Sequence, residues 1–137
     1  ALGNHARNIQ YVTLNIDDKP LTVINFHGLW NGKGKKDSED RINQSKNILE
    51  FTRRISGEFV LCGDFNLSPE TESLKMFEVN GLRNLIREYG GTSTRTSHYT
   101  KEEKFADYVF TTKGIAVKDF RVLPEEVSDH AAIFLEL

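Results

Sequence analysis

Two short motifs in this sequence join a carboxylate to a second polar side chain at the end of an apolar run. In GDFN, Asp64 and Asn66 follow such a run, and in SDH, Asp129 and His130 precede one. A carboxylate binds hard cations such as Mg²⁺, and a histidine exchanges protons near neutral pH. These residue types therefore fit metal-assisted hydrolysis. The structural alternatives are an Asx turn at GDFN and a capping aspartate beside a surface histidine at SDH.

The spacing within GDFN places its two polar side chains together. Asp64 and Asn66 are two residues apart, so they point to the same side of a strand, while Phe65 points the other way, into packing. Asp64 is a candidate for orienting a water or a metal-bound group. Asn66 is a candidate for donating an amide N–H to a phosphate oxygen.

Two further polar residues lie in or at the end of apolar segments. Asp107 lies among aromatic residues in FADYVF, where an unpaired carboxylate is costly. A histidine on a neighbouring strand would be a suitable partner, because a buried aspartate fixes the tautomer of an imidazole and raises its basicity. A structural ion pair with an arginine or lysine is the alternative. His27 ends the segment VINFH, and it is either a member of the same site or structural.

The hydrophobic pattern predicts the elements that position these residues. It predicts strands over 8–17, 21–28, 58–64, 105–112, 116–123 and 131–137. Helical spacing predicts a helix over 39–56 that Gly57 closes, a second helix that Ser68 caps and that ends near Gly81, and a short piece over 82–91. The fold class is α/β, and strand ends that share a sheet would bring the polar residues to one edge.

Length and composition limit the possible domain organisation, partners and compartment less strictly than the motifs do. The 137 residues predict one domain, residues 1–137. A net charge of -2 and a pI of about 6.1 argue against binding long duplex DNA by bulk charge. Cys62 is the single cysteine, which excludes an internal disulfide and favours the cytoplasm. No apolar run approaches the roughly 18 residues of a membrane-spanning helix, and no signal peptide is visible.

Several residues are weaker candidates for substrate contacts. The loop NGKGKK carries positive charge close to His27, which suits a phosphate substrate or is simply a solvated loop. Trp30 either stacks on a base or ring, or packs against the following helix. Arg41 and Arg95 have side chains that hold phosphate in a bidentate way.

The ordered motifs NFHG, GDFNLSP, FADYVF and SDHAAI resemble the endonuclease/exonuclease/phosphatase superfamily, whose founding fold is that of pancreatic deoxyribonuclease. The resemblance runs from the strand before NFHG to the last strand. It implies a two-sheet αββα sandwich with helices outside, of which this chain is the C-terminal half, with one mixed and mostly antiparallel sheet. It also implies hydrolysis of phosphate esters assisted by Mg²⁺ or Mn²⁺. Nucleic acids, inositol phosphates, sphingolipid head groups and small phosphodiesters all remain open as substrates.

The same resemblance implies roles for the residues at the strand ends. Asp129 would be a metal ligand and His130 the catalytic histidine, oriented by Asp107. Asp64 would position or deprotonate the attacking water. The general base stays open between these groups, with the Asp107–His130 pair favoured.

Two roles at the phosphate follow from the resemblance as well. Asn66 would contact the phosphate, and His27 would contact it or assist the leaving group. Members of the family begin with a strand that carries an asparagine, then a helix and a Gln-Glu pair whose glutamate is a principal metal ligand. Asn4 and Asn8 are present near the start of this sequence, but no Gln-Glu pair follows.

This departure leads to two expectations. The inner face of the sheet would lack its covering layer, and such apolar faces associate with another surface. We therefore expect a homodimer or an N-terminal half supplied from elsewhere. The function is either a metal-dependent phosphoesterase or, because the glutamate ligand is absent, a non-catalytic half-domain that acts as a binding or interaction module. An unrelated α/β domain with coincidental motifs is the third alternative.

Overall fold

The computed structural model of the protein describes residues 7–137. Its strands are β1 (Ile9–Ile16), β2 (Lys19–His27), β3 (Glu58–Asp64), β4 (Arg83–Asn84), β5 (Asp107–Thr111), β6 (Asp119–Val122) and β7 (Ile133–Glu136). Its helices are α1 (Glu39–Thr52), α2 (Glu72–Val79) and α3 (Leu85–Glu88). The predicted α/β class is confirmed. Each predicted strand corresponds to one observed strand, but β2 begins at Lys19, two residues before the predicted start.

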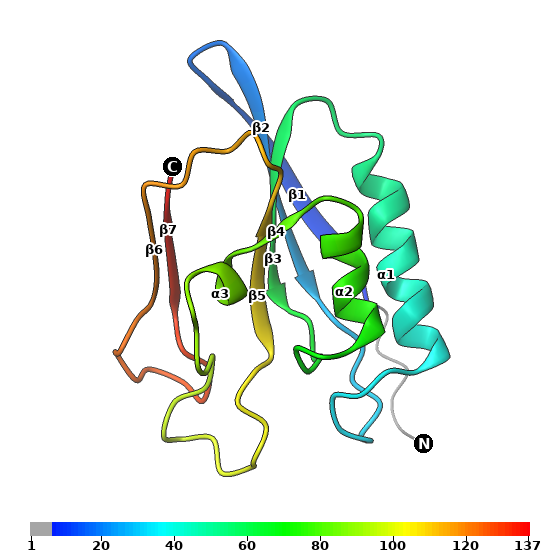
Figure 1. Ribbon diagram of the computed structural model, residues 1–137, viewed down its shortest axis with the longest axis vertical. Helices are drawn as coiled ribbons and strands as arrows, with labels where there is room; N and C mark the ends of the chain where they lie inside the picture. The colour runs from blue at the N-terminus through cyan, green and yellow to red at the C-terminus, as the bar shows by residue number, and fades with distance from the viewer. Residues whose placement is uncertain (1–6) are drawn as a thin grey trace.

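Five strands form a mixed sheet in the order β1-β2-β3-β5-β4, and β6 and β7 form a separate antiparallel pair. Within the larger sheet only β2 and β3 are parallel, joined through α1, while the other neighbours are antiparallel. Helices α1 and α2 lie on one side of this sheet, and the β6–β7 pair lies on the other (Figure 1). The described part of the chain is therefore layered as helices, a large sheet and a small one.

The predicted hairpin of the first two strands is confirmed, and its turn has a clear cause. Ile16 pairs with Lys19, so Asp17 and Asp18 alone form the loop, and their φ angles are 50° and 61°. Positive φ at both central residues is the geometry of a type I′ turn, which matches the twist of antiparallel strands. Aspartate tolerates this geometry better than most other residues.

The two longer predicted helices differ from the observed ones at an end, and the predicted short helical piece over 82–91 consists of β4 followed by α3. Helix α1 ends at Thr52 rather than Ser56, so Gly57 (φ 84°) lies in the turn before β3 and not at the helix end. Helix α2 begins at Glu72, after a turn in which the N–H and Oγ1 of Thr71 donate to the carbonyl of Ser68, so Ser68 does not cap the helix. Asp37, from the loop before α1, instead accepts hydrogen bonds from the N–H groups of Glu72 and Ser73 at 2.8 and 2.9 Å. This long-range cap ties the loop that follows β2 to α2.

The core lies between the sheet and the helices, and Phe65 is at its centre. Its ring is 1% exposed and packs edge-on against Phe26, Phe77 and Tyr108, with ring centroids 5.2 to 5.6 Å apart. The expected packing role of Phe65 is thus confirmed. Because Phe65 sits between Asp64 and Asn66, its burial anchors both polar neighbours at the end of β3.

The opposite face of the sheet is partly open. The Tyr11 ring contacts Phe51 of α1, so the alternate residues of β1 point away from the helices. Those residues, Val12, Leu14 and Ile16, are 52%, 43% and 48% exposed. The predicted exposed apolar face is therefore present over β1. Across residues 7–137, no helix is long and apolar enough to cross a membrane.

Candidate active site

Three of the predicted site residues lie in one row at the ends of the three inner strands of the sheet. His27, the last residue of β2, pairs with Asp64, the last residue of β3, and Asp64 pairs with Asp107, the first residue of β5. Residues paired across neighbouring strands project from the same face of a sheet. The convergence that the strand-end pattern indicated is present, and it follows from the order β2-β3-β5.

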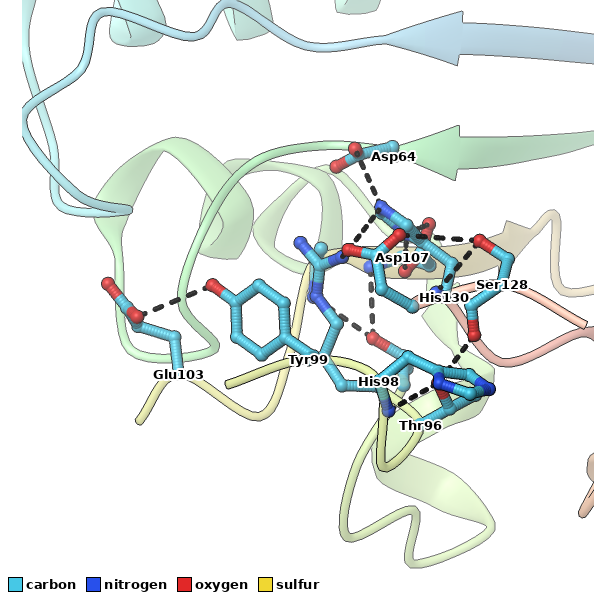
Figure 2. Close-up of polar contacts among 12 residues, drawn as sticks. Asp64, Thr96, His98, Tyr99, Glu103, Asp107, Ser128 and His130 are labelled. Atoms are coloured by element: carbon cyan, nitrogen blue, oxygen red, sulfur yellow. Dashed lines mark hydrogen bonds and ion pairs between the residues drawn. The ribbon is translucent and has the colours of Figure 1, made fainter. Parts of the chain in front are cut away.

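His130 joins this row from the loop before β7 (Figure 2). Its Nδ1 lies 2.8 Å from Oδ2 and 3.0 Å from Oδ1 of Asp107, and its Nε2 lies 3.8 Å from Oδ2 of Asp64. The Asp107 side chain is 15% exposed. Burial raises the pKa of the Asp107 carboxyl, and the hydrogen bond with His130 opposes that shift. A carboxylate that accepts from Nδ1–H leaves Nε2 free to take up a proton.

The GDFN corner has a backbone geometry that holds Asp64 in place. Asn66 has a φ of 52°, and its N–H donates to Oδ1 of Asp64 at 2.9 Å, which is an Asx turn. The Asn66 amide is buried and donates to the carbonyl of Gly28 at 3.2 Å. The Asx turn that the sequence offered as the structural alternative is present, and the other oxygen of Asp64 faces His130 and His27.

Asp129 lies beside the row, but an arginine holds it. Its Oδ2 is 3.0 Å from Nη1 of Arg95 and 4.0 Å from Nε2 of His130. The Arg95 side chain is 6% exposed, and its guanidinium lies 4.1 Å from the ring centroid of Tyr99. The structure thus brings Asp129 and Arg95 together at the site.

The segment around Thr94 positions both members of the Asp107–His130 pair, and the sequence did not reveal this. The buried Thr94 Oγ1 accepts hydrogen bonds from the N–H groups of Ala106 and Asp107 at 3.0 and 3.2 Å. The Thr94 carbonyl accepts from the N–H of Ala131, and Arg95 forms a β-bridge with His130. This stretch reads as a polar loop or edge hairpin in sequence, and only its alternating small hydroxyl residues hinted at strand-like pairing.

The comparison with known protein families agrees with these motifs. The family described as Endonuclease/Exonuclease/phosphatase matches residues 7–130. The chain belongs to this family. Among curated proteins, no sequence matches the chain.

Solved structures of other proteins share this fold at low sequence identity. A mannosyl-6-phosphatase of Bacteroides thetaiotaomicron is 20% identical to this chain, with a TM-score of 0.72. The match covers 95% of this chain and 56% of the phosphatase chain. D. rerio TDP2, complexed with a single-strand DNA product, is 16% identical with a TM-score of 0.72. The match covers 98% of this chain and 62% of the TDP2 chain. The human Nocturnin catalytic domain with bound sulfate is 19% identical with a TM-score of 0.63, covering 95% and 53%. The chain spans a little over half the length of these proteins.

The residues of the row fit the divalent metal that this family generally uses. Asp64, Asp107 and His130 each offer one ligand atom, and these atoms lie within 4.8 Å of one another. Two carboxylates suit Mg²⁺ and Mn²⁺, and an imidazole suits transition metals. The Asp107 carboxylate and Nδ1 of His130 are already bonded to each other, so Oδ2 of Asp64 and Nε2 of His130 are the ligand atoms outside this hydrogen bond.

The remaining predicted residues lie at different distances from the row. His27 is exposed, and its Nε2 is 3.6 Å from Oδ2 of Asp64. Trp30 is 40% exposed, with Nζ of Lys101 5.6 Å from its ring centroid. Arg41 is buried and donates to the carbonyls of Leu29 and Lys36. Arg41, in the first turn of α1, therefore binds the loop after β2 and does not lie in the row.

Proposed function

We propose that this protein is a Mg²⁺- or Mn²⁺-dependent phosphoesterase whose chemistry is centred on the Asp64–Asp107–His130 row. The observation that carries the proposal is the contact of His130 Nδ1 with the buried Asp107, with Nε2 facing Asp64. This arrangement has a proton acceptor, a group that holds its tautomer, and a carboxylate beside it. A histidine that a carboxylate holds in one tautomer is an arrangement that supports general acid–base catalysis.

In the proposed reaction a water held by Asp64 attacks phosphorus and loses its proton to Nε2 of His130, while the bond between phosphorus and the ester oxygen breaks. The leaving oxygen takes a proton and departs as an alcohol, and the His130 imidazolium then returns its proton to solvent. Asp107 accepts the hydrogen bond from Nδ1–H and stabilises the imidazolium that forms. His27, next to Asp64, contacts a phosphate oxygen or the leaving group. A divalent cation held by Asp64 and Asp129 would neutralise charge that develops on the phosphate oxygens.

The substrate is a phosphate ester, and the similar structures offer candidate classes. One is a sugar phosphatase, and one is bound to a single-strand DNA product. The net charge of -2 favours a small phosphate ester or a short strand over long duplex DNA. The open apolar face over β1 supports a homodimer or an added N-terminal half as the partner.

A second function is supported by the Arg95–Asp129 ion pair. Arg95 occupies the carboxylate that a metal would need, which would suit a non-catalytic module that only binds a partner or ligand.

The test is hydrolysis of bis(4-nitrophenyl) phosphate and of 4-nitrophenyl phosphate by the purified chain, with Mg²⁺, with Mn²⁺ and with excess chelator. An Asp129→Ala variant is assayed in parallel. Activity that requires metal and is lost in the variant supports the phosphoesterase. A folded chain that hydrolyses neither ester with either metal contradicts it and favours the binding module.

A further inference from the structure

Lys35, in the loop after β2, is buried in an unusual way. Only 2% of the residue is exposed, and its Nζ donates to the carbonyl of Phe105 at 2.7 Å. Within residues 7–137 no carboxylate lies within 4.0 Å of this ammonium. A buried charge without an opposite charge beside it is costly, and such groups concentrate at functional sites. The ammonium has three N–H donors, of which this carbonyl uses one.

Arg95 is a second buried cation next to Lys35. Its Nη1 donates to Asp129, while its buried Nε has no hydrogen-bond partner in the described part of the chain. Both cations lie against the ring of Tyr99, with Nζ of Lys35 5.2 Å and Cζ of Arg95 4.1 Å from its centroid. Burial lowers the pKa of Lys35, and the charge of Arg95 lowers it further. Each of the two side chains therefore keeps N–H donors that no group in the described residues uses, and both cations lie against the ring of Tyr99.

These two cations border the Asp64–Asp107–His130 row. Lys35 bonds the carbonyl of Phe105, two residues before Asp107, and Arg95 forms the β-bridge with His130. We propose that Lys35 and Arg95 form an anion subsite that holds a phosphate group of the substrate beside His130. The subsite's role in turnover rests on the proposed phosphoesterase function, whereas its binding of phosphate does not.

The chemistry of the two side chains suits a tetrahedral oxyanion. An ammonium acts as a compact point charge, and a guanidinium stacked on an aromatic ring keeps its donors in a fixed plane. The carboxylates of Asp64, Asp107 and Glu103 lie near Lys35 and oppose an incoming anion. Phosphate binding should therefore be measured with Mg²⁺ present, because the cation offsets these negative charges.

The experiment is an isothermal calorimetric titration of inorganic phosphate into the full chain, in saturating Mg²⁺ and at constant ionic strength. Lys35→Met keeps the apolar stem and removes the charge, and Lys104→Met removes an exposed lysine of the neighbouring loop as a matched control. We expect Lys35→Met to weaken phosphate binding by roughly 10- to 100-fold. Lys104→Met should bind as the wild type does. Dimethyl phosphate in place of phosphate distinguishes an internal diester from a terminal phosphate as the preferred group.

A second measurement does not depend on how the variants fold. In the wild type, the Nε–Hε resonance of Arg95 should shift on phosphate addition, with assignment from Arg95→Lys. Absence of phosphate binding, or equal binding by wild type and a folded Lys35→Met, overturns the subsite. Hydrolysis is followed in the same samples. Lys35-dependent phosphate binding without hydrolysis would refute the phosphoesterase alone, and hydrolysis with unchanged binding in Lys35→Met would refute the subsite alone.

Discussion

Substitution of Asp107 by asparagine should separate the activity of this protein from its stability. Asp107 accepts one N–H from His130 over two short contacts, 2.8 and 3.0 Å, in a mostly buried position. A hydrogen bond with a charged partner is worth about 1.5–3 kcal/mol, which corresponds to roughly 10- to 150-fold in rate. The asparagine amide can also donate to Nδ1, which moves the imidazole proton to Nε2 and removes the proton acceptor. The loss in kcat should therefore be at least about 100-fold.

The same Asp107→Asn substitution should leave the free energy of unfolding near pH 7 unchanged or raise it. Burial raises the pKa of Asp107 above the ordinary value of 3.8, although the hydrogen bond with His130 opposes the shift. An acid with a raised pKa in the folded state binds more protons folded than unfolded, so its ionised form lowers the free energy of unfolding. This cost is fully present above the raised pKa and is absent below about 3.8. The neutral asparagine removes it.

The assay compares the wild type and Asp107→Asn by phosphodiester hydrolysis and by thermal unfolding between pH 3 and pH 8. We expect much lower activity together with an equal or higher Tm near pH 7, and a Tm difference that shrinks toward acid pH. Asp119→Asn, at the first residue of β6 and outside the row, controls for loss of a carboxylate elsewhere. Activity within threefold of wild type in Asp107→Asn would refute the role of this carboxylate in orienting His130.

Two further substitutions test the scaffold of the site. Thr94→Val removes the acceptor of two N–H groups at 3.0 and 3.2 Å, and it should cost about 1–3 kcal/mol of unfolding free energy and lower kcat, with Thr94→Ser restoring both. If urea unfolding of Thr94→Val matches the wild type, Thr94 does not support the Asp107 strand. A Cβ added in Gly28→Ala would overlap the carbonyl of Phe65 at the GDFN corner, so we expect a lower Tm and lost activity, and an unchanged Tm would contradict this close packing.

The row of strand-end residues could be predicted from sequence because strong local signals mark it. Alternating or continuous apolar runs indicate where β2 and β3 end and where β5 lies, and a carboxylate or histidine at such a position has little value for packing. Because β2 and β3 are parallel and β5 is antiparallel to β3, the ends of β2 and β3 meet the start of β5. The alternation of Val12, Leu14 and Ile16 with polar residues predicts only that they share one side of a strand. That this side is exposed is expected from the family resemblance, which implies a covering layer that the sequence lacks.

The features that sequence did not reveal depend on contacts between distant residues. Asp37 caps a helix that begins 35 residues later, which no local capping pattern around Ser68 can show. Lys35 lies in a glycine-containing charged loop that reads as solvated, yet it is buried against Phe105. Arg41 reads as a free cation at a helix start, but three of its contacts are with loop carbonyls.

The most direct test of the account uses two histidines of the same chain. His130→Gln and the exposed His98→Gln are compared with the wild type in hydrolysis of bis(4-nitrophenyl) phosphate with Mn²⁺, after circular dichroism shows that all three are folded. The account predicts that His130→Gln loses activity by about 100-fold or more, while His98→Gln stays close to wild type. Equal activity of all three proteins would contradict the claim that the Asp64–Asp107–His130 row carries out the chemistry.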